Sequence, residues 1–263
     1  MLNKLLKYDL KYMIKNMSVF YILAIFFAIT TRILSLLEQS VIISILTKIS
    51  SGFVIAMIAN IIINTIIRSW VRFRDSIYKD EAYLTHTLPV TKNDIYNSKF
   101  IQTILFSIIG LIVIIITMFI SYYTKDRWES LTTMISKISQ GLDYNKVLLV
   151  ISFITIIFLE AYNGIQSGFL GLILGHKKNN NKLFFSVLFG LIVYILSQTI
   201  VVLFIYITGI FDKDIMKLFT SKELIDTGSL KLLIIISIIA YTLIIFIMNL
   251  ICKKELNKGV DIE

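Results

Sequence analysis

Residues 100–123, FIQTILFSIIGLIVIIITMFISYY, contain no charged side chain. An α-helix rises about 1.5 Å per residue, so about 20 residues cross the hydrocarbon core of a bilayer. The stretch is long enough to do this, and its few polar groups are hydroxyls and one amide. It therefore predicts a helix that spans a membrane.

Five further runs have the same character. The second of the six is the least sharply bounded, because residues 41–46 before it are also apolar and Lys48 interrupts the pattern. The alternating pattern of outer-membrane β-strands is absent, and a helix satisfies its own backbone hydrogen bonds in lipid. The sequence predicts an all-α, polytopic membrane protein with a single transmembrane domain over residues 1–263. Its predicted spans are Ser18–Leu37, Ile49–Ile67, Phe100–Tyr123, Val147–Leu174, Leu183–Ile210 and Leu232–Cys252.

The composition supports a lipid environment. Hydrophobic residues make up 57% of the chain, charged residues 16%, and the mean hydropathy is +0.82. A soluble domain of 263 residues has no interior large enough for so much apolar surface, so the surplus must contact the lipid bilayer. The net charge of +9 is explained by anionic headgroups, and no nucleic-acid partner is expected.

Lysine and arginine are distributed unequally between the two sets of loops. If the N-terminus is inside, 16 of the 26 basic residues fall on the inner side, six of them in the loop 68–99. Cytoplasmic loops are enriched in these residues. We therefore expect a multi-pass protein of the cell membrane with both termini in the cytoplasm.

Residues 1–17 are expected to form a cytoplasmic interfacial helix. Leucines 2, 5, 6 and 10 and Met13 share one helical face, and the lysines lie elsewhere. Such a helix is suited to lie on the inner leaflet. The alternative is a simple extension of the first span.

Motifs for catalysis are missing from the sequence. No G-x-x-x-x-G-K-[ST] loop occurs, so the chain is not expected to bind or hydrolyse ATP by itself. Neither histidine falls inside a predicted span, and the single cysteine, Cys252, supports neither a disulfide nor a metal site. We expect no cofactor, no metal and no enzymatic activity for this chain.

Polar side chains inside the predicted spans are the candidates for function. Glu160 falls near the middle of the fourth run, where an ionisable group is costly unless it finds a partner or water, so we expect it to face inward. The others occur beside small residues at helical spacing or halfway along the fifth run. They either hold helices together or line a polar translocation path. The candidates are Asn60, Asn64, Glu160, Asn163, Ser167 and Gln198.

A polar segment, YKDEAYLTHTLPVTKNDIY (residues 78–96), separates the second and third spans. Thr91 followed by Asp94 has the pattern of a helix N-cap, and Pro89 before it prevents a continuous helix. The segment also contains apolar residues where a solvated loop is expected. They either dock against another protein or lie against the inner headgroups. These apolar residues are Tyr83, Leu84 and Leu88.

Residues 80–91, DEAYLTHTLPVT, resemble a segment of the bacterial ABC-2 type permeases, which are membrane subunits of ABC transporters. A Glu-Gly-Tyr-Leu-Thr-x-Thr-Leu-Pro-Val-Ser pattern is common in that family, so Ala82 and Thr91 are small departures from it. The order of six spans, with this motif after the second, is also similar over nearly the whole chain.

The resemblance implies a transport subunit, most often of an exporter. The loop 68–99 would contact a separate ABC ATPase, which binds ATP and Mg²⁺, and a second permease chain, identical or related, would complete the path. The extracellular loop 211–231 would accommodate short re-entrant helices. The residues expected to couple to the ATPase are Asp80, Glu81, Tyr83, Leu84, Leu88 and Pro89, with the two acids pairing at the rim.

Two other classes of protein remain open. One is an ATP-independent secondary transporter that uses Glu160 as a proton or cation relay, for which internal repeats are expected and none is evident. The other is a non-catalytic membrane sensor or assembly protein.

Overall fold

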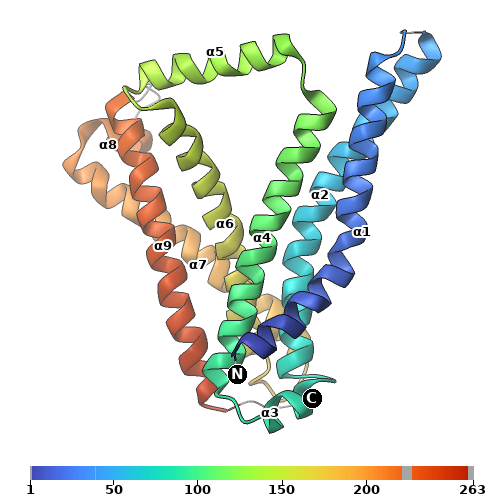
Figure 1. Cartoon of the computed structure of the whole chain (residues 1–263). Helices are drawn as coiled ribbons and strands as arrows, with labels where there is room; N and C mark the ends of the chain where they lie inside the picture. Colours follow the sequence, from blue (N-terminus) through green and yellow to red (C-terminus); the bar gives the residue numbers. More distant parts are fainter. Residues whose placement is uncertain (1, 39, 221–226, 260–263) are drawn as a thin grey trace. The chain divides into compact units, whose positions relative to one another are not determined.

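The computed structural model describes residues 2–38, 40–220 and 227–259, and these contain helices but no β-strand (Figure 1). Six of the helices, α1, α2, α4, α6, α7 and α9, are long and apolar enough to cross a membrane. The prediction of an all-α, polytopic fold is confirmed. The helices are α1 (Leu2–Leu36), α2 (Val41–Ile77), α3 (Ala82–Thr87), α4 (Lys92–Tyr122), α5 (Lys125–Gly141), α6 (Lys146–Gly175), α7 (Lys182–Phe211), α8 (Lys213–Thr220) and α9 (Thr227–Asn257).

The long helices extend past the predicted spans into polar sequence. The helix α2 begins after Ser40, whose hydroxyl accepts a hydrogen bond from the Ile43 N–H at 3.3 Å, and it continues to Ile77. The helix α4 already begins at Lys92. The loop predicted over 68–99 is therefore shorter than expected, because residues 68–77 and 92–99 are helical continuations of the two spans.

The chain divides into two compact units, Met1–Glu129 and Ser130–Glu263, and each contains three of the candidate spans. The boundary falls within α5. The single transmembrane domain over 1–263 stays a prediction.

In the first unit, α1 packs against both α2 and α4, and α2 also contacts α4. Met13 and Met17 of α1 form a buried cluster with Phe106 of α4. Farther along, the hydroxyls of Thr31 and Ser50 lie 2.8 Å apart in a hydrogen bond between α1 and α2. Methionine fills irregular gaps between helices well, which suits the first of these contacts.

The first 17 residues are not separated from the first span, because α1 is one helix from Leu2 to Leu36. Of the face predicted to lie on the headgroups, Met13 is buried and the four leucines are half-buried. This segment packs on α4 through Met13 and Met17. Residues 2–17 therefore continue the first span as one helix, and their position at the inner headgroups stays a prediction.

In the second unit, α6 packs against α7 and α9. Small residues allow α6 and α7 to approach closely: a Cβ added at Gly171 would lie 2.5 Å from the Gly190 Cα. Val201 of α7 packs in a buried cluster with residues of α9, which include Tyr241 and Met248. Close approach through glycine is a common way for helices to associate in lipid, where dispersion contacts replace the hydrophobic effect.

The helices α3 and α5 were not predicted from the sequence, whereas α8 lies in the loop where the resemblance implied short helices. The polar segment after α4 forms α5, and the segment after α7 forms α8. In α8, Ile215 is buried and lies against Gly209 of α7, and the Tyr206 and Phe219 rings meet edge to face at 5.3 Å. A short helix therefore does occur within the loop 211–231, but re-entry into the membrane stays a prediction and residues 221–226 lie outside the described residues.

Replacement of Gly171 by valine should separate α6 from α7. The added side chain meets backbone atoms of Gly190 and Ser186 at 2.5–2.6 Å, and backbone cannot rotate away. We expect the free energy of unfolding in detergent to fall by about 1–3 kcal/mol, the range for overpacked interiors. Gly164→Val on the same helix is the control, because its nearest contact would be an ordinary 4.0 Å to the Tyr194 ring. Equal stability of the two variants would contradict this packing.

Candidate functional site

The segment between α2 and α4 carries an apolar surface on a very short helix. In α3 the residues that face the protein are small or polar, since Ala82 and Thr85 are buried. The large apolar residues face outward: Tyr83 is 74% exposed, Leu84 68% and Leu88 45%. This distribution is the inverse of that in an ordinary surface helix, whose large apolar side chains point inward. The exposed side chains make up a surface that another protein or a headgroup layer would cover.

The chain leaves α3 through Pro89 and enters α4 at a well-formed cap. The Asp94 N–H donates a hydrogen bond to the Thr91 hydroxyl at 3.1 Å, and that hydroxyl donates to the Asp94 carboxylate at 3.0 Å. Leu88, before the proline, has the extended conformation that a following proline favours. The predicted N-cap at Thr91 is confirmed, and it fixes where the third span begins.

The other end of α3 is tied to α2 by an ion pair. The Arg72 guanidinium donates from Nη1 to both oxygens of Glu81, at 2.7 Å each. Within α3, the Thr85 hydroxyl donates to the Glu81 carbonyl at 2.9 Å, and the His86 ring lies 3.0 Å from the Ile77 carbonyl through Nε2. Glu81 was expected at the rim of an ATPase contact, but its carboxylate is held by Arg72 of its own chain.

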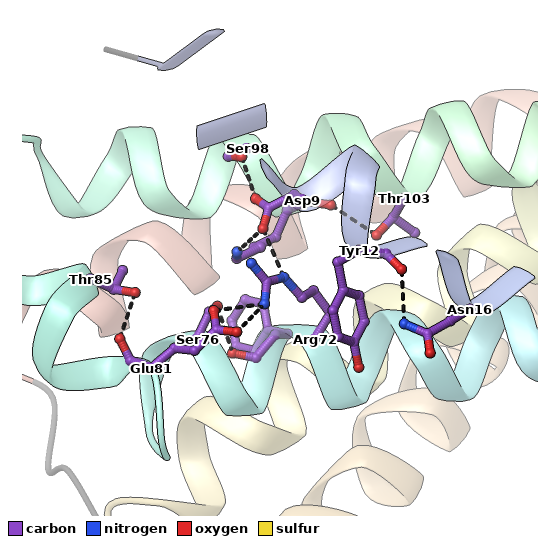
Figure 2. A network of polar contacts seen from close by, with 11 residues as sticks. Asp9, Tyr12, Asn16, Arg72, Ser76, Glu81, Thr85, Ser98 and Thr103 are labelled. Atoms are coloured by element: carbon purple, nitrogen blue, oxygen red, sulfur yellow. Dashed lines mark hydrogen bonds and ion pairs between the residues drawn. The ribbon is translucent and has the colours of Figure 1, made fainter. Parts of the chain in front are cut away.

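Arg72 also bonds to a buried carboxylate on α1 (Figure 2). Its Nε donates to Asp9 Oδ1 at 2.9 Å, and Ser98 of α4 donates from its hydroxyl to Asp9 Oδ2 at 2.6 Å. The Lys99 ammonium forms a second ion pair with Asp9 Oδ1. The Arg72 guanidinium lies 4.7 Å from the centre of the Tyr12 ring, close enough for a cation–π contact.

Asp9, Arg72 and Lys99 are all buried, and Glu81 is half-exposed. Two carboxylates face two cations, so the formal charges of the group cancel. Burial of charges costs several kcal/mol per ion, and it is tolerated when each ion keeps several hydrogen bonds. We call these four residues, together with Ser98, the Asp9 network. It joins α1, α2, α4 and the segment that carries α3.

Three of the residues predicted within the spans do hold helices together. Asn163 of α6 donates to the Ser197 hydroxyl of α7 at 2.8 Å, and the Ser167 hydroxyl of α6 lies 3.9 Å from the Met248 sulfur of α9. On the other side of α7, the Tyr241 hydroxyl of α9 donates to Gln198 Oε1 at 3.0 Å. These contacts place Asn163, Ser167 and Gln198 at helix interfaces of the second unit.

The other three candidates lie elsewhere. Glu160 was expected to face inward, but it is exposed on the surface of α6 in its own unit. Asn60 and Asn64 donate to carbonyls four residues earlier on α2, at 3.0 Å each, and neither forms a hydrogen bond to a second helix among the described residues. The depth of a residue in a span does not determine which side of the helix it occupies, and the inward orientation of Glu160, toward a helix interface or a wet cavity, stays a prediction.

The sequence reasoning did not find the Asp9 network. One signal was available: Asp9 precedes Met13 and Met17 by four and eight residues, so it shares the helical face that those residues bury. It is also the only acidic residue among the first 17, beside four lysines. An acid on a buried face requires cationic partners, and the basic residues of the 68–99 segment were the nearest candidates.

The arrangement offers anchoring and an exposed contact surface rather than a recognisable reaction centre. Among the described residues, no group of three or more His, Cys, Asp or Glu side chains is placed to hold a metal ion. Comparisons with protein-family models, with curated proteins and with solved structures found no match.

Removal of the central carboxylate should destabilise the first unit. Asp9→Asn leaves Arg72 and Lys99 buried without the charge that compensates them. We expect the free energy of unfolding in detergent to fall by about 3–5 kcal/mol, the cost of breaking a buried pair. The matched control is Asp214→Asn, which removes a partly exposed pair with Lys217 and should cost about 0–1 kcal/mol. Equal losses in both variants would show that the Asp9 network does not hold the helices together.

Proposed function

We propose that this chain is the membrane-spanning permease subunit of an ABC transporter of the ABC-2 type, with the ATPase on a separate polypeptide. The observation that carries the proposal is the outward-facing apolar surface formed by Tyr83 and Leu84 of α3 and by Leu88, which directly follows it. The segment resembles the ABC-2 motif in sequence and lies between the second and third of six candidate spans. A surface of this kind is suited to a partner's pocket.

The energetics favour a protein partner for this surface. An exposed leucine or tyrosine gains about 1.5–3 kcal/mol when it is fully buried, so three such side chains can anchor a contact. Asp80, which is exposed beside them, can form an ion pair at the rim, where charge affects the association rate more than the affinity. Glu81 has a different task in this proposal, because it fastens α3 to Arg72.

The Asp9 network provides the mechanical link that coupling requires. A displacement of α3 is passed through Glu81 to Arg72 on α2 and from Arg72 to Asp9 on α1. Lys99 and Ser98 pass it from Asp9 to the start of α4. Because packed, hydrogen-bonded helices shift as rigid elements rather than deform, a movement of the ATPase would tilt all three spans of the first unit.

The remaining parts of the transporter follow from the same proposal. The ATPase binds ATP and Mg²⁺, a second permease chain, identical or related, completes the translocation path, and transport is outward across the cell membrane. Three polar residues of the spans are not buried between the helices of their own units, so in this proposal they can contact a second chain or line the translocation path. They are Asn60, Asn64 and Glu160.

The contact between α3 and the ATPase can be tested with two aspartates. Leu84→Asp combined with Leu88→Asp places charge on the surface that we expect to be buried. Loss of two apolar anchors should weaken binding of the ATPase at least about 100-fold, measured by co-purification from membranes, while insertion stays normal. The control is Leu131→Asp combined with Leu218→Asp, two exposed leucines on α5 and α8.

The control pair should leave the complex intact. If the α3 double variant also keeps a fully coupled ATPase, the apolar side chains only contact lipid headgroups and the functional assignment is wrong. If both pairs dissociate the complex, the effect is one of general instability, and the assignment of α3 as the contact is likewise refuted.

The proposal also places both termini in the cytoplasm. Lys79 and Lys137 are exposed, so each can be replaced by cysteine in a Cys252→Ala background and labelled with a membrane-impermeant maleimide in intact cells. We expect labelling at position 137 without permeabilisation and at position 79 only after it, because the basic loops are retained inside. Labelling of position 79 from outside would reverse the topology and exclude contact with a cytoplasmic ATPase.

A further inference from the structure

The second unit contains a cavity of about 470 Å³ that the proposed function does not use. Its walls come from the last turn of α5, the first half of α6 and the first half of α9. The volume falls within the range of about 300–1,000 Å³ that is typical of small-molecule sites. Large apolar side chains line it: Leu142, Phe153, Ile156, Leu230, Leu233 and Ile234.

The side chains that line the cavity offer no unused hydrogen-bonding group to an occupant. Ser237 is the only lining residue with a polar side chain, and its hydroxyl donates to the Leu233 carbonyl at 2.8 Å. The cavity is open on one side, where Phe153 and Leu230 are exposed, and its apolar lining gives water almost no polar partner. An occupant must therefore be apolar along the part that enters the cavity.

A cation lies beside this apolar lining. Lys231 stands between the lining residues Leu230 and Leu233 in sequence, and its ammonium lies 5.2 Å from the centre of the Tyr144 ring. Tyr144 is itself held by a hydrogen bond between its hydroxyl and that of Ser152 at 3.2 Å. No ion pair of Lys231 occurs among the residues that the structure describes, so its charge is available to an anion.

Local hydrogen bonds hold the turn that follows α5, next to the cavity. The Leu142 N–H donates to the Ile138 carbonyl at 2.9 Å, which closes the last turn of α5. The Tyr144 N–H donates to the Ser139 carbonyl at 3.0 Å, and the Ser139 hydroxyl returns a bond to the Tyr144 carbonyl. The turn that carries Tyr144 therefore keeps it next to the lining residue Leu142.

We propose that the cavity binds one acyl chain of an anionic glycerophospholipid, with the phosphate group beside Lys231. An apolar cavity next to an uncompensated lysine matches the two parts of such a lipid, and a basic residue at a helix end attracts anionic headgroups. Six apolar spans place the chain in a bilayer, where this ligand is the surrounding solvent. The site depends on membrane residence and not on the proposed transport function.

The site can be mapped with a photoreactive lipid. The purified chain is reconstituted in phosphatidylcholine vesicles that contain phosphatidylglycerol with a diazirine near the end of one acyl chain, irradiated, digested and analysed by mass spectrometry. We expect label to concentrate in residues 138–156 and 228–237, above that on the exposed face of α7. The same diazirine on phosphatidylcholine should label these residues less.

Two variants test the two halves of the site. A Cβ added at Gly141, a lining residue, meets no atom within 4 Å, so Gly141→Phe can fill the cavity without a clash at its first atom. Displacement of as few as two methylene groups should lower labelling about tenfold. Lys231→Gln should reduce the preference for phosphatidylglycerol over phosphatidylcholine about fivefold and leave labelling by phosphatidylcholine unchanged.

The controls are Gly52→Phe, also in open space but on α2, and Lys48→Gln, an exposed lysine of the first unit. Neither should change the labelling. The proposal is overturned if the wild-type cavity is labelled no more than the exposed face of α7, if Gly141→Phe labels like the wild type, or if the two lipids label equally. Transport need not be measured, so the outcome is independent of the ATPase.

Discussion

One buried carboxylate, that of Asp9, organises the end of the first unit at which α1 begins. It accepts hydrogen bonds or ion pairs from Arg72 of α2 and from Ser98 and Lys99 of α4. A buried charge with a single partner would be destabilising, so three partners on two other helices are the condition under which it is tolerated. Contacts with all three partners require that α1, α2 and α4 lie close together at the end of the unit near α3. Arg72 forms a further ion pair with Glu81, which precedes α3.

The exposed surface of α3 is a consequence of this anchoring. Ala82 and Thr85 of this six-residue helix are buried against the protein, and its large apolar side chains, those of Tyr83 and Leu84, point outward. A flexible loop with the same side chains could bind a partner, but it would absorb that partner's motion. A helix that is fixed at Glu81 and followed by the Thr91 cap is able to transmit the partner's motion to α4. This combination of exposure and anchoring is what we expect of a coupling element, and it supports the proposal made for α3.

The features that were predictable from the sequence depend on short-range physics. The six spans follow from the cost of placing charge in hydrocarbon, and the cap at Thr91 follows from a local hydrogen bond. The Asp9 network could not be predicted as a set, because its members are separated by up to 90 residues and no local pattern pairs Asp9 with Lys99. Residues such as Asn163 were predicted at a helix interface from their spacing beside small residues. Glu160 is exposed in its own unit, and depth in a span does not specify the side of the helix that a residue occupies.

The most direct measurement is a cross-link formed in living cells from position 84. A photoreactive phenylalanine analogue replaces Leu84, and the captured protein is identified by mass spectrometry, with position 218 on α8 as the reference because Leu218 is also exposed. The account predicts that position 84 captures a protein that carries the G-x-x-x-x-G-K-[ST] nucleotide-binding loop and that position 218 does not. Cross-links from position 84 to lipid alone, or to the same proteins as from position 218, would contradict it.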